Sequence, residues 1–65
     1  MEARMKLNVL YTKLGPAQKA KVRVVGDVVL YDNGTTIYEA LWDRESDDLI
    51  PRTVATRNAL NALGP

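Results

Sequence analysis

Cysteine and histidine are both missing from this chain of 65 residues. Without cysteine no disulfide can form, and without either residue type the usual zinc sites are excluded. The same absence removes the imidazole base and the thiolate nucleophile on which many enzymes depend. The sequence therefore predicts a protein that is not an enzyme, holds no cofactor or metal, and converts no small-molecule substrate.

Long apolar runs are also missing. The longest, residues 28–31, is far too short to span a bilayer, and the opening residues 1–4 carry no apolar segment of the kind that forms a signal peptide. A hydrophobic content of 46% argues against intrinsic disorder. We expect a protein without membrane contact, located in the cytoplasm or incorporated in a larger particle.

The short chain leaves room for one domain, residues 1–65, with a thin core. A domain of this size buries only about 60% of the surface of its unfolded chain. Disulfides and metals usually compensate for such a core, and both are excluded here. Oligomerisation or docking onto a partner is therefore expected to contribute to its stability.

Strand signals dominate the first two thirds of the sequence. Residues 5–12 alternate between apolar and polar side chains, which predicts a half-buried strand. Asn33-Gly34 is typical of a two-residue hairpin turn, and Gly26-Asp27 fits a second turn or a bulge. These turns predict an antiparallel meander of strands 21–25, 28–32 and 35–42.

Two-residue turns would align Val29 with Tyr38, whereas a three-residue turn at 32–34 would shift the last strand by one residue and exchange its faces. In the two-residue register, one face carries the expected core residues Val22, Val24, Val29, Tyr31, Tyr38, Ala40 and Trp42. The reverse face carries Lys21, Arg23, Val25, Val28, Leu30, Asp32, Ile37, Glu39 and Leu41. This reverse face is too apolar to be left to water, so we expect the C-terminal helix, a protein partner or a second copy to cover it.

The C-terminal third predicts a short edge strand at 49–51 and a helix over 54–63, with Thr53 as the N-cap and Gly64-Pro65 as the stop. The small residues Ala55, Ala59 and Ala62 share one side of that helix with Leu63, and Leu60 lies at the edge of this side. The expected fold is mainly β: a small barrel or bent antiparallel sheet with a short C-terminal helix.

Three segments resemble the SH3-like small β-barrel in order and approximate spacing across residues 9–54. They are Val9-Leu10-Tyr11, Gly26-Asp27-Val28-Val29, and Ile37-Tyr38-Glu39-Ala40 followed by Asp48-Leu49-Ile50-Pro51. The resemblance implies a barrel that binds other proteins. It does not extend to the Pro-rich-peptide site, because Ile37 stands where signalling SH3 domains have Trp and Val54 where they have Tyr.

A second resemblance covers less of the chain. Gly26 to Tyr31, Gly34, and Tyr38 to Trp42 are similar to small chitin-binding modules, which implies carbohydrate binding as one alternative. In those modules a second aromatic follows the Trp and stacks on sugar. Here Asp43 occupies that place.

Charge is unevenly distributed along the sequence. Residues 1–24 carry six basic side chains against one acidic, and residues 25–50 carry seven acidic against one basic. A basic face could bind nucleic acid through Lys6, Lys13, Lys19, Lys21 and Arg23. The alternative is that basic and acidic strands lie side by side and pair across the sheet.

The function favoured by these patterns is a small protein–protein interaction module: an inhibitor, an adaptor, or a small subunit of a larger assembly such as a virion. Trp42 ends the long strand where its ring can be partly exposed, and tryptophan often dominates binding energy. The acidic residues after it would steer a basic partner, and they lack the ligand spacing of a calcium loop. The predicted partner-binding residues are Trp42, Asp43, Glu45, Asp47 and Asp48.

Overall fold

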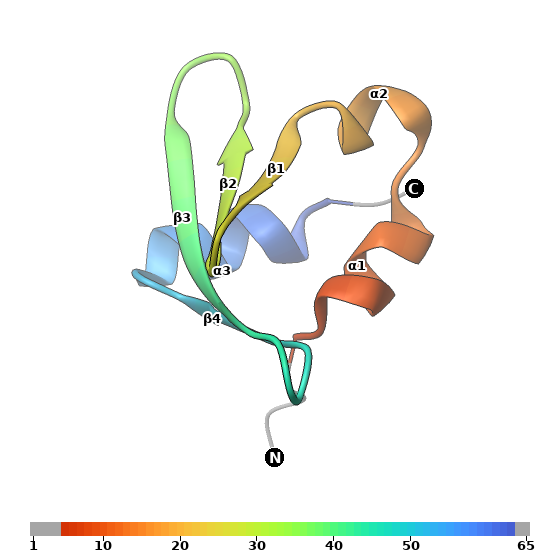
Figure 1. Ribbon diagram of the computed structural model, residues 1–65. Helices are drawn as coiled ribbons and strands as arrows, with labels where there is room; N and C mark the ends of the chain where they lie inside the picture. Colours follow the sequence, from red (N-terminus) through yellow and green to blue (C-terminus); the bar gives the residue numbers. More distant parts are fainter. Residues whose placement is uncertain (1–4, 64–65) are drawn as a thin grey trace.

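The computed structural model describes residues 5–63, in which a four-stranded sheet is packed against helices (Figure 1). Gly64-Pro65, the predicted helix stop, and the segment 1–4 lie outside the described residues. In chain order the elements are α1 (Leu7–Lys13), α2 (Pro16–Lys19), β1 (Val22–Val25), β2 (Val28–Asp32), β3 (Ile37–Asp43), β4 (Asp48–Pro51) and α3 (Val54–Asn61).

The sheet is antiparallel, has the strand order β1-β2-β3-β4, and is not closed. The predicted meander and the short fourth strand are both confirmed. The fold is thus the open-sheet form of the predicted class, an antiparallel sheet with a short C-terminal helix, rather than a closed barrel.

The predicted two-residue turn at Asn33-Gly34 is wrong. The loop spans residues 33–36, because the Asn33 side-chain oxygen accepts the backbone N–H groups of Thr35 and Thr36, each at 2.8 Å. Val29 therefore lies opposite Ala40, two residues beyond the expected partner. Since side chains alternate with a period of two, this shift leaves the predicted faces of the strand unchanged.

The strand predicted over residues 5–12 is also wrong, because this segment forms helix α1. Leu7, Leu10 and Leu14 are buried, and their spacing of three and four residues places them on one side of a helix. Val9, which the strand would have turned inward, is 49% exposed. Of this segment, Lys6 alone makes a β-bridge, with Asp48.

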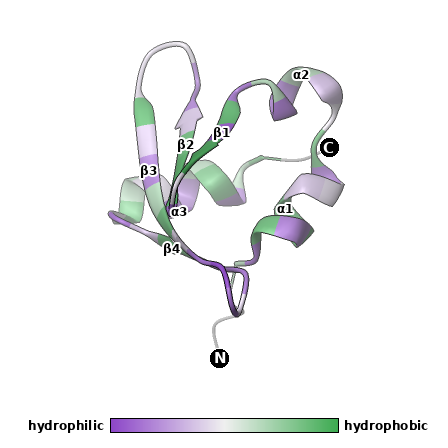
Figure 2. Cartoon of the chain, viewed as in Figure 1, coloured by the Kyte–Doolittle hydropathy of each residue, from purple (hydrophilic) through white to green (hydrophobic). Residues whose placement is uncertain are grey.

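The core lies between the sheet and the helices. The face that we call the inner face contributes one buried residue from each strand, and these pack with leucines from α1, the α1–α2 link and α3. In Figure 2, hydrophobic segments recur along the strands and on α1 and α3, whereas the β3–β4 turn is hydrophilic. The buried cluster comprises Leu7, Leu10, Leu14, Val22, Val29, Ala40, Leu49 and Leu60.

Helix α3 begins as predicted, with the Thr53 hydroxyl accepting the N–H of Thr56 at 3.0 Å, and ends at Asn61. The predicted alanine face is not the buried one: Ala55 and Ala62 are exposed, whereas Thr56 and Leu60 are buried. Burying Leu60 removes more apolar surface from water than burying an alanine, which explains the rotation of the helix.

Gly34→Ala should lower the free energy of unfolding by about 1–2 kcal/mol, because a side chain disfavours left-handed backbone. Gly34 has φ 94°, and a Cβ there meets nothing within 4 Å, so the cost is in the backbone alone. Gly15→Ala is the control, since Gly15 has φ −77° and equally open space. Urea unfolding followed by circular dichroism measures both variants, and equal losses would contradict this explanation.

Candidate functional site

The sheet face turned away from the core, here called the outer face, carries a row of four aliphatic side chains, one from each strand. Val25 pairs with Val28, Val28 with Leu41, and Leu41 with Ile50 in the strand registers. We call these four residues the aliphatic row. It crosses the sheet perpendicular to the strands, close to the β1–β2 and β3–β4 turns.

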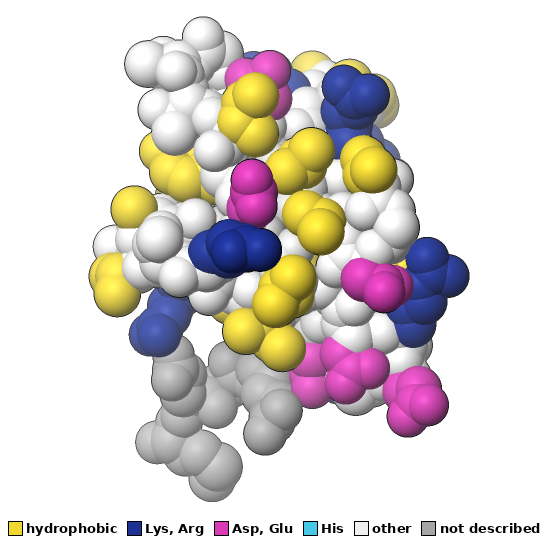
Figure 3. All heavy atoms as spheres, turned by 60° about the vertical axis from the view of Figure 1, so that its left-hand side comes forward, with side chains coloured by type: hydrophobic (Ala, Val, Ile, Leu, Met, Phe, Trp, Pro, Cys, Tyr) yellow, Lys and Arg dark blue, Asp and Glu magenta, His cyan; other side chains and the backbone are white. Residues whose placement is uncertain are grey.

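Much of the aliphatic row is exposed: Val25 is 56% accessible, Leu41 42% and Ile50 54%, while Val28 is half-buried. Figure 3 shows hydrophobic side chains gathered over this part of the surface. The reverse face predicted from the sequence is therefore the outer face. Helix α3 does not cover it, because Leu60 packs into the core on the inner face.

Charged side chains flank the aliphatic row on both sides. Toward the 33–36 loop, the next row across the sheet contains Arg23, Leu30 and Glu39, with Arg52 joined to Glu39 by an ion pair of 3.2 Å. Toward the β3–β4 turn, the row is followed by Asp43 and Glu45, which line a hollow together with Leu41 and Ile50. Asp27 and Arg44 line the same hollow from the side of Trp42. The first flank has a net charge of +1 and the second a net charge of −2.

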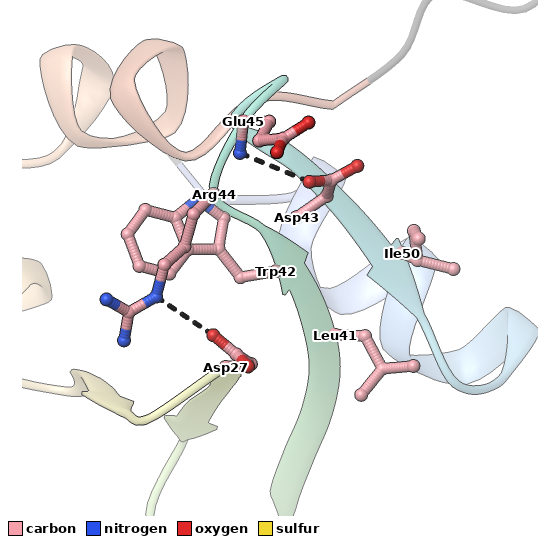
Figure 4. Close-up of a pocket in the computed structure, with 7 residues that line it drawn as sticks. All are labelled: Asp27, Leu41, Trp42, Asp43, Arg44, Glu45 and Ile50. Atoms are coloured by element: carbon pink, nitrogen blue, oxygen red, sulfur yellow. Dashed lines mark hydrogen bonds and ion pairs between the residues drawn. The ribbon is translucent and has the colours of Figure 1, made fainter.

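The hollow has a volume of about 440 Å³ and is lined by Asp27, Leu41, Trp42, Asp43, Arg44, Glu45 and Ile50. Figure 4 shows Trp42 on one side of β3, with Leu41 and Ile50 on the other. The Arg44 guanidinium lies 5.3 Å from the centre of the Trp42 ring, and its Nε donates to Asp27 at 2.9 Å. One face of the indole is therefore already occupied by a cation of the same chain.

The structure brings together three of the five predicted partner-binding residues around this hollow: Trp42, Asp43 and Glu45. Asp47 instead makes internal contacts. Its side chain accepts the indole N–H of Trp42 at 2.9 Å and the backbone N–H of Asn8 at 2.8 Å. Asp47 thus caps the start of α1, satisfying an N–H that the helix itself leaves unpaired.

Asp48, the fifth predicted residue, is buried and binds the Lys6 ammonium at 3.0 Å. The same ammonium donates to the Ser46 carbonyl at 2.7 Å. This ion pair fastens the segment before α1 to the start of β4. Neither Asp47 nor Asp48 presents a free carboxylate to a partner.

The five basic residues proposed for nucleic acid do not form a single surface. Lys6 is held in the pair with Asp48, Lys13 and Lys19 lie on α1 and α2, and Arg23 lies on the outer face. Lys21 immediately precedes β1, where its carbonyl accepts the N–H of Asp32. Lys6 and Lys21 thus lie beside acidic residues, Asp48 and Asp32.

Tyr31, Tyr38 and Trp42 lie on the inner face, where they were predicted. Tyr31 and Tyr38 are cross-strand neighbours with ring centroids 5.9 Å apart and nearly parallel planes. Tyr31 and Trp42 pack against the buried cluster. Tyr31 and Trp42 therefore extend the core, and Tyr38 stacks on Tyr31.

Comparison of the chain with protein-family models, with curated proteins and with solved structures finds no significant match. Within residues 5–63, no group of acidic side chains has the geometry of a metal site. The helices of the same segment are all too short or too polar to cross a bilayer.

Sequence reasoning identified the apolar reverse face but missed that four of its residues align as a row. Ile50 was left out because the pairing of β4 with β3 could not be read from the turns. The contact between Asp47 and Asn8 was missed because it joins residues about forty positions apart. In the structure, Asp47 adopts φ 63°, a conformation in which aspartate is enriched.

Asp47→Ala should lower the free energy of unfolding by about 2–4 kcal/mol, because it removes two hydrogen bonds to a carboxylate and places alanine in left-handed backbone. Asp47→Gly removes the same bonds without the backbone strain, so its loss should be about 1 kcal/mol smaller. Urea unfolding followed by circular dichroism gives both values.

Glu45→Ala is the control for these variants, because Glu45 is an exposed residue of the same turn. We expect it to change the stability by less than about 0.5 kcal/mol. An Asp47→Ala protein as stable as the Glu45→Ala protein would show that the Asp47 contacts do not hold the turn to α1.

Proposed function

We propose that this chain is a small non-catalytic protein-interaction module that docks through the outer face of its sheet. The observation that supports this proposal is the aliphatic row, in which Val25, Leu41 and Ile50 are exposed and Val28 is half-buried while α1 and α3 pack on the other face. Contiguous apolar surface of this kind is uncommon on monomeric proteins and marks interaction sites.

Removing the exposed side chains of the row from water is energetically favourable. Fully burying an aliphatic side chain contributes about 1.5–3 kcal/mol. Since roughly half of Val25 and Ile50 is still exposed, covering them should contribute on the order of 1 kcal/mol each. Several such contributions are comparable with the few kcal/mol of net stability that a domain of this size has.

The surroundings of the row match the anatomy of a protein interface. An apolar centre is ringed by charged residues, including Arg23 and the Arg52–Glu39 pair on one side and Asp43 on the other. The hollow at the end of the row is also lined by Trp42 and Arg44, two residue types that are enriched among those dominating binding energy, on the other side of β3 from Leu41 and Ile50. A partner that covers the row therefore meets Asp43 at its rim, and it contacts Trp42 and Arg44 if it extends around the end of β3.

An inhibitor, an adaptor and a small subunit of a larger particle such as a virion would all use such a surface, either in the cytoplasm or inside the particle. A nucleic-acid or carbohydrate ligand has less support. The basic residues are distributed over α1, α2, β1 and the outer face, and the aromatic rings pack with the core.

Leu41→Lys combined with Ile50→Glu should abolish protein binding and leave the fold intact. The two positions are directly paired between β3 and β4, so the introduced charges attract each other and the net charge is unchanged. The melting temperature should move by only a few degrees, while the half of the aliphatic row that lies on β3 and β4 becomes charged. Affinity capture from native lysate, compared with the unaltered chain, gives the binding result.

Val54→Lys combined with Asn58→Glu is the matched control. It introduces the same two charges at exposed positions one turn apart on α3, away from the outer face. We expect this variant to retain every bound protein. Loss of binding in the control together with retention in the sheet variant would place the docking surface on the helical side and contradict the proposal.

A further inference from the structure

We propose that Asn33 is a site of self-catalysed modification, at which the 33–36 loop converts the asparagine into aspartate and isoaspartate with loss of ammonia. This inference is independent of the docking surface. The Asn33-Gly34 pair does not form the expected two-residue turn, and the hydrogen bonds that surround it instead fit this reaction.

The reaction closes a five-membered succinimide ring within the chain. The backbone nitrogen of Gly34 attacks the side-chain amide carbon of Asn33 and gives up its proton. The bond from that carbon to the side-chain nitrogen breaks, and the released nitrogen takes up the proton and leaves as ammonia. Water, the one co-reactant, then opens the ring at either carbonyl and yields aspartate or isoaspartate.

The attacking nitrogen has a base beside it. The Gly34 N–H donates to the Asp32 carboxylate, with 2.8 Å between the nitrogen and Oδ1. A backbone amide is a weak nucleophile until its proton is removed. A carboxylate at hydrogen-bond distance from that proton is placed to act as a general base and then to deliver the proton to the leaving nitrogen.

The attacked amide group has two donors on its oxygen. The backbone N–H groups of Thr35 and Thr36 donate to Oδ1 of Asn33, each at 2.8 Å. Negative charge develops on this oxygen when the Gly34 nitrogen adds to the amide carbon. Two N–H groups already directed at it form an oxyanion hole of the kind that stabilises tetrahedral intermediates.

The loop also keeps the reacting atoms near each other. The hydrogen bond from Thr35 to Asn33 closes a ring of atoms that contains both the Asn33 amide carbon and the Gly34 nitrogen. The Asn33 N–H donates to the Thr36 carbonyl at 3.2 Å, which fixes the backbone of the same residue. A loop held in this way loses less freedom on reaching the transition state than an unfolded chain does.

The site is open to water and unobstructed. Residues 32–36 are exposed, so water can reach the succinimide ring. Gly34 has no side chain to hinder its nitrogen, and even a Cβ there would meet nothing within 4 Å. Figure 1 shows the loop between β2 and β3 at the end of the hairpin, projecting beyond the rest of the sheet.

The two products should differ in their effect on the sheet. Aspartate at this position keeps an acceptor oxygen for the N–H groups of Thr35 and Thr36, so the loop and the β2–β3 register should persist. Isoaspartate adds a methylene to the backbone and moves the acceptor, so it should disturb both. Each product takes the formal net charge of the chain from +1 to zero.

Peptide mapping by mass spectrometry of the full chain, incubated at neutral pH, tests the proposal, because conversion adds one dalton to the peptide that contains Asn33. The folded chain should convert about tenfold faster, or more, than the same chain unfolded in guanidinium chloride, which keeps the sequence and loses the loop. Asn58, which lies in α3, is the internal control and should stay unconverted over the same time.

Asp32→Asn tests the base. The amide keeps an oxygen that can accept the Gly34 N–H but cannot take up its proton, so conversion in the folded chain should fall about tenfold or more. Asp43→Asn is the matched control, because Asp43 is exposed and likewise accepts the N–H of the second residue after it, Glu45. This control should convert Asn33 at the unaltered rate, and circular dichroism melts check that both variants are folded.

A folded chain that converts Asn33 no faster than the unfolded chain overturns the inference, because the loop then adds nothing to the reactivity of the Asn-Gly pair. An Asp32→Asn variant that converts as fast as the Asp43→Asn control overturns the role of Asp32 as the base. In guanidinium chloride the two variants should convert at the same rate, since neither retains the loop. A slower Asp32→Asn reaction there as well would show a sequence effect and would also contradict the proposal.

Discussion

The contacts of Asp47 decide where α1 lies, and with it which face of the sheet is covered. The backbone carbonyl of Asp47 accepts the N–H of Leu7 at 3.0 Å, and its carboxylate binds the N–H of Asn8 and the Trp42 indole. These bonds tie the start of α1 to the β3–β4 turn, and the Lys6–Asp48 ion pair strengthens the same junction. The leucines of α1 are thereby directed into the core on the inner face.

The uncovered outer face follows from this arrangement. Residues from α1 and α3 share the inner face with one residue from each strand, so the aliphatic row has no helix above it. A single layer of helices over a small sheet buries few large side chains, and stability is correspondingly limited. Any partner that binds the folded but not the unfolded chain will stabilise the fold by mass action. The docking that we propose on the outer face would therefore also stabilise the fold.

The parts of the fold determined by local residue types could be predicted from the sequence. The meander, the Thr53 cap and the two faces of the strands all depend on neighbours within a few positions. Residues 5–12 satisfy both an alternating pattern and the helical spacing of Leu7, Leu10 and Leu14, so their own pattern could not choose between strand and helix. Asp47, some forty residues later, contributes the cap that sequence reasoning could not see.

The candidate site could also be predicted only in part. Trp42, Asp43 and Glu45 line a hollow as a group, whereas Asp47 and Asp48 bind to distant residues of the same chain.

The claim that the outer face is the docking surface can be tested most directly by amide chemical shifts of the labelled chain, recorded before and after addition of a protein recovered with it by affinity capture. We expect amides of Val25, Val28, Leu41 and Ile50 and their strand neighbours to shift on addition of that protein. Amides of α1 and α3, which pack on the opposite face, should stay constant. Shifts confined to the helices would contradict the claim.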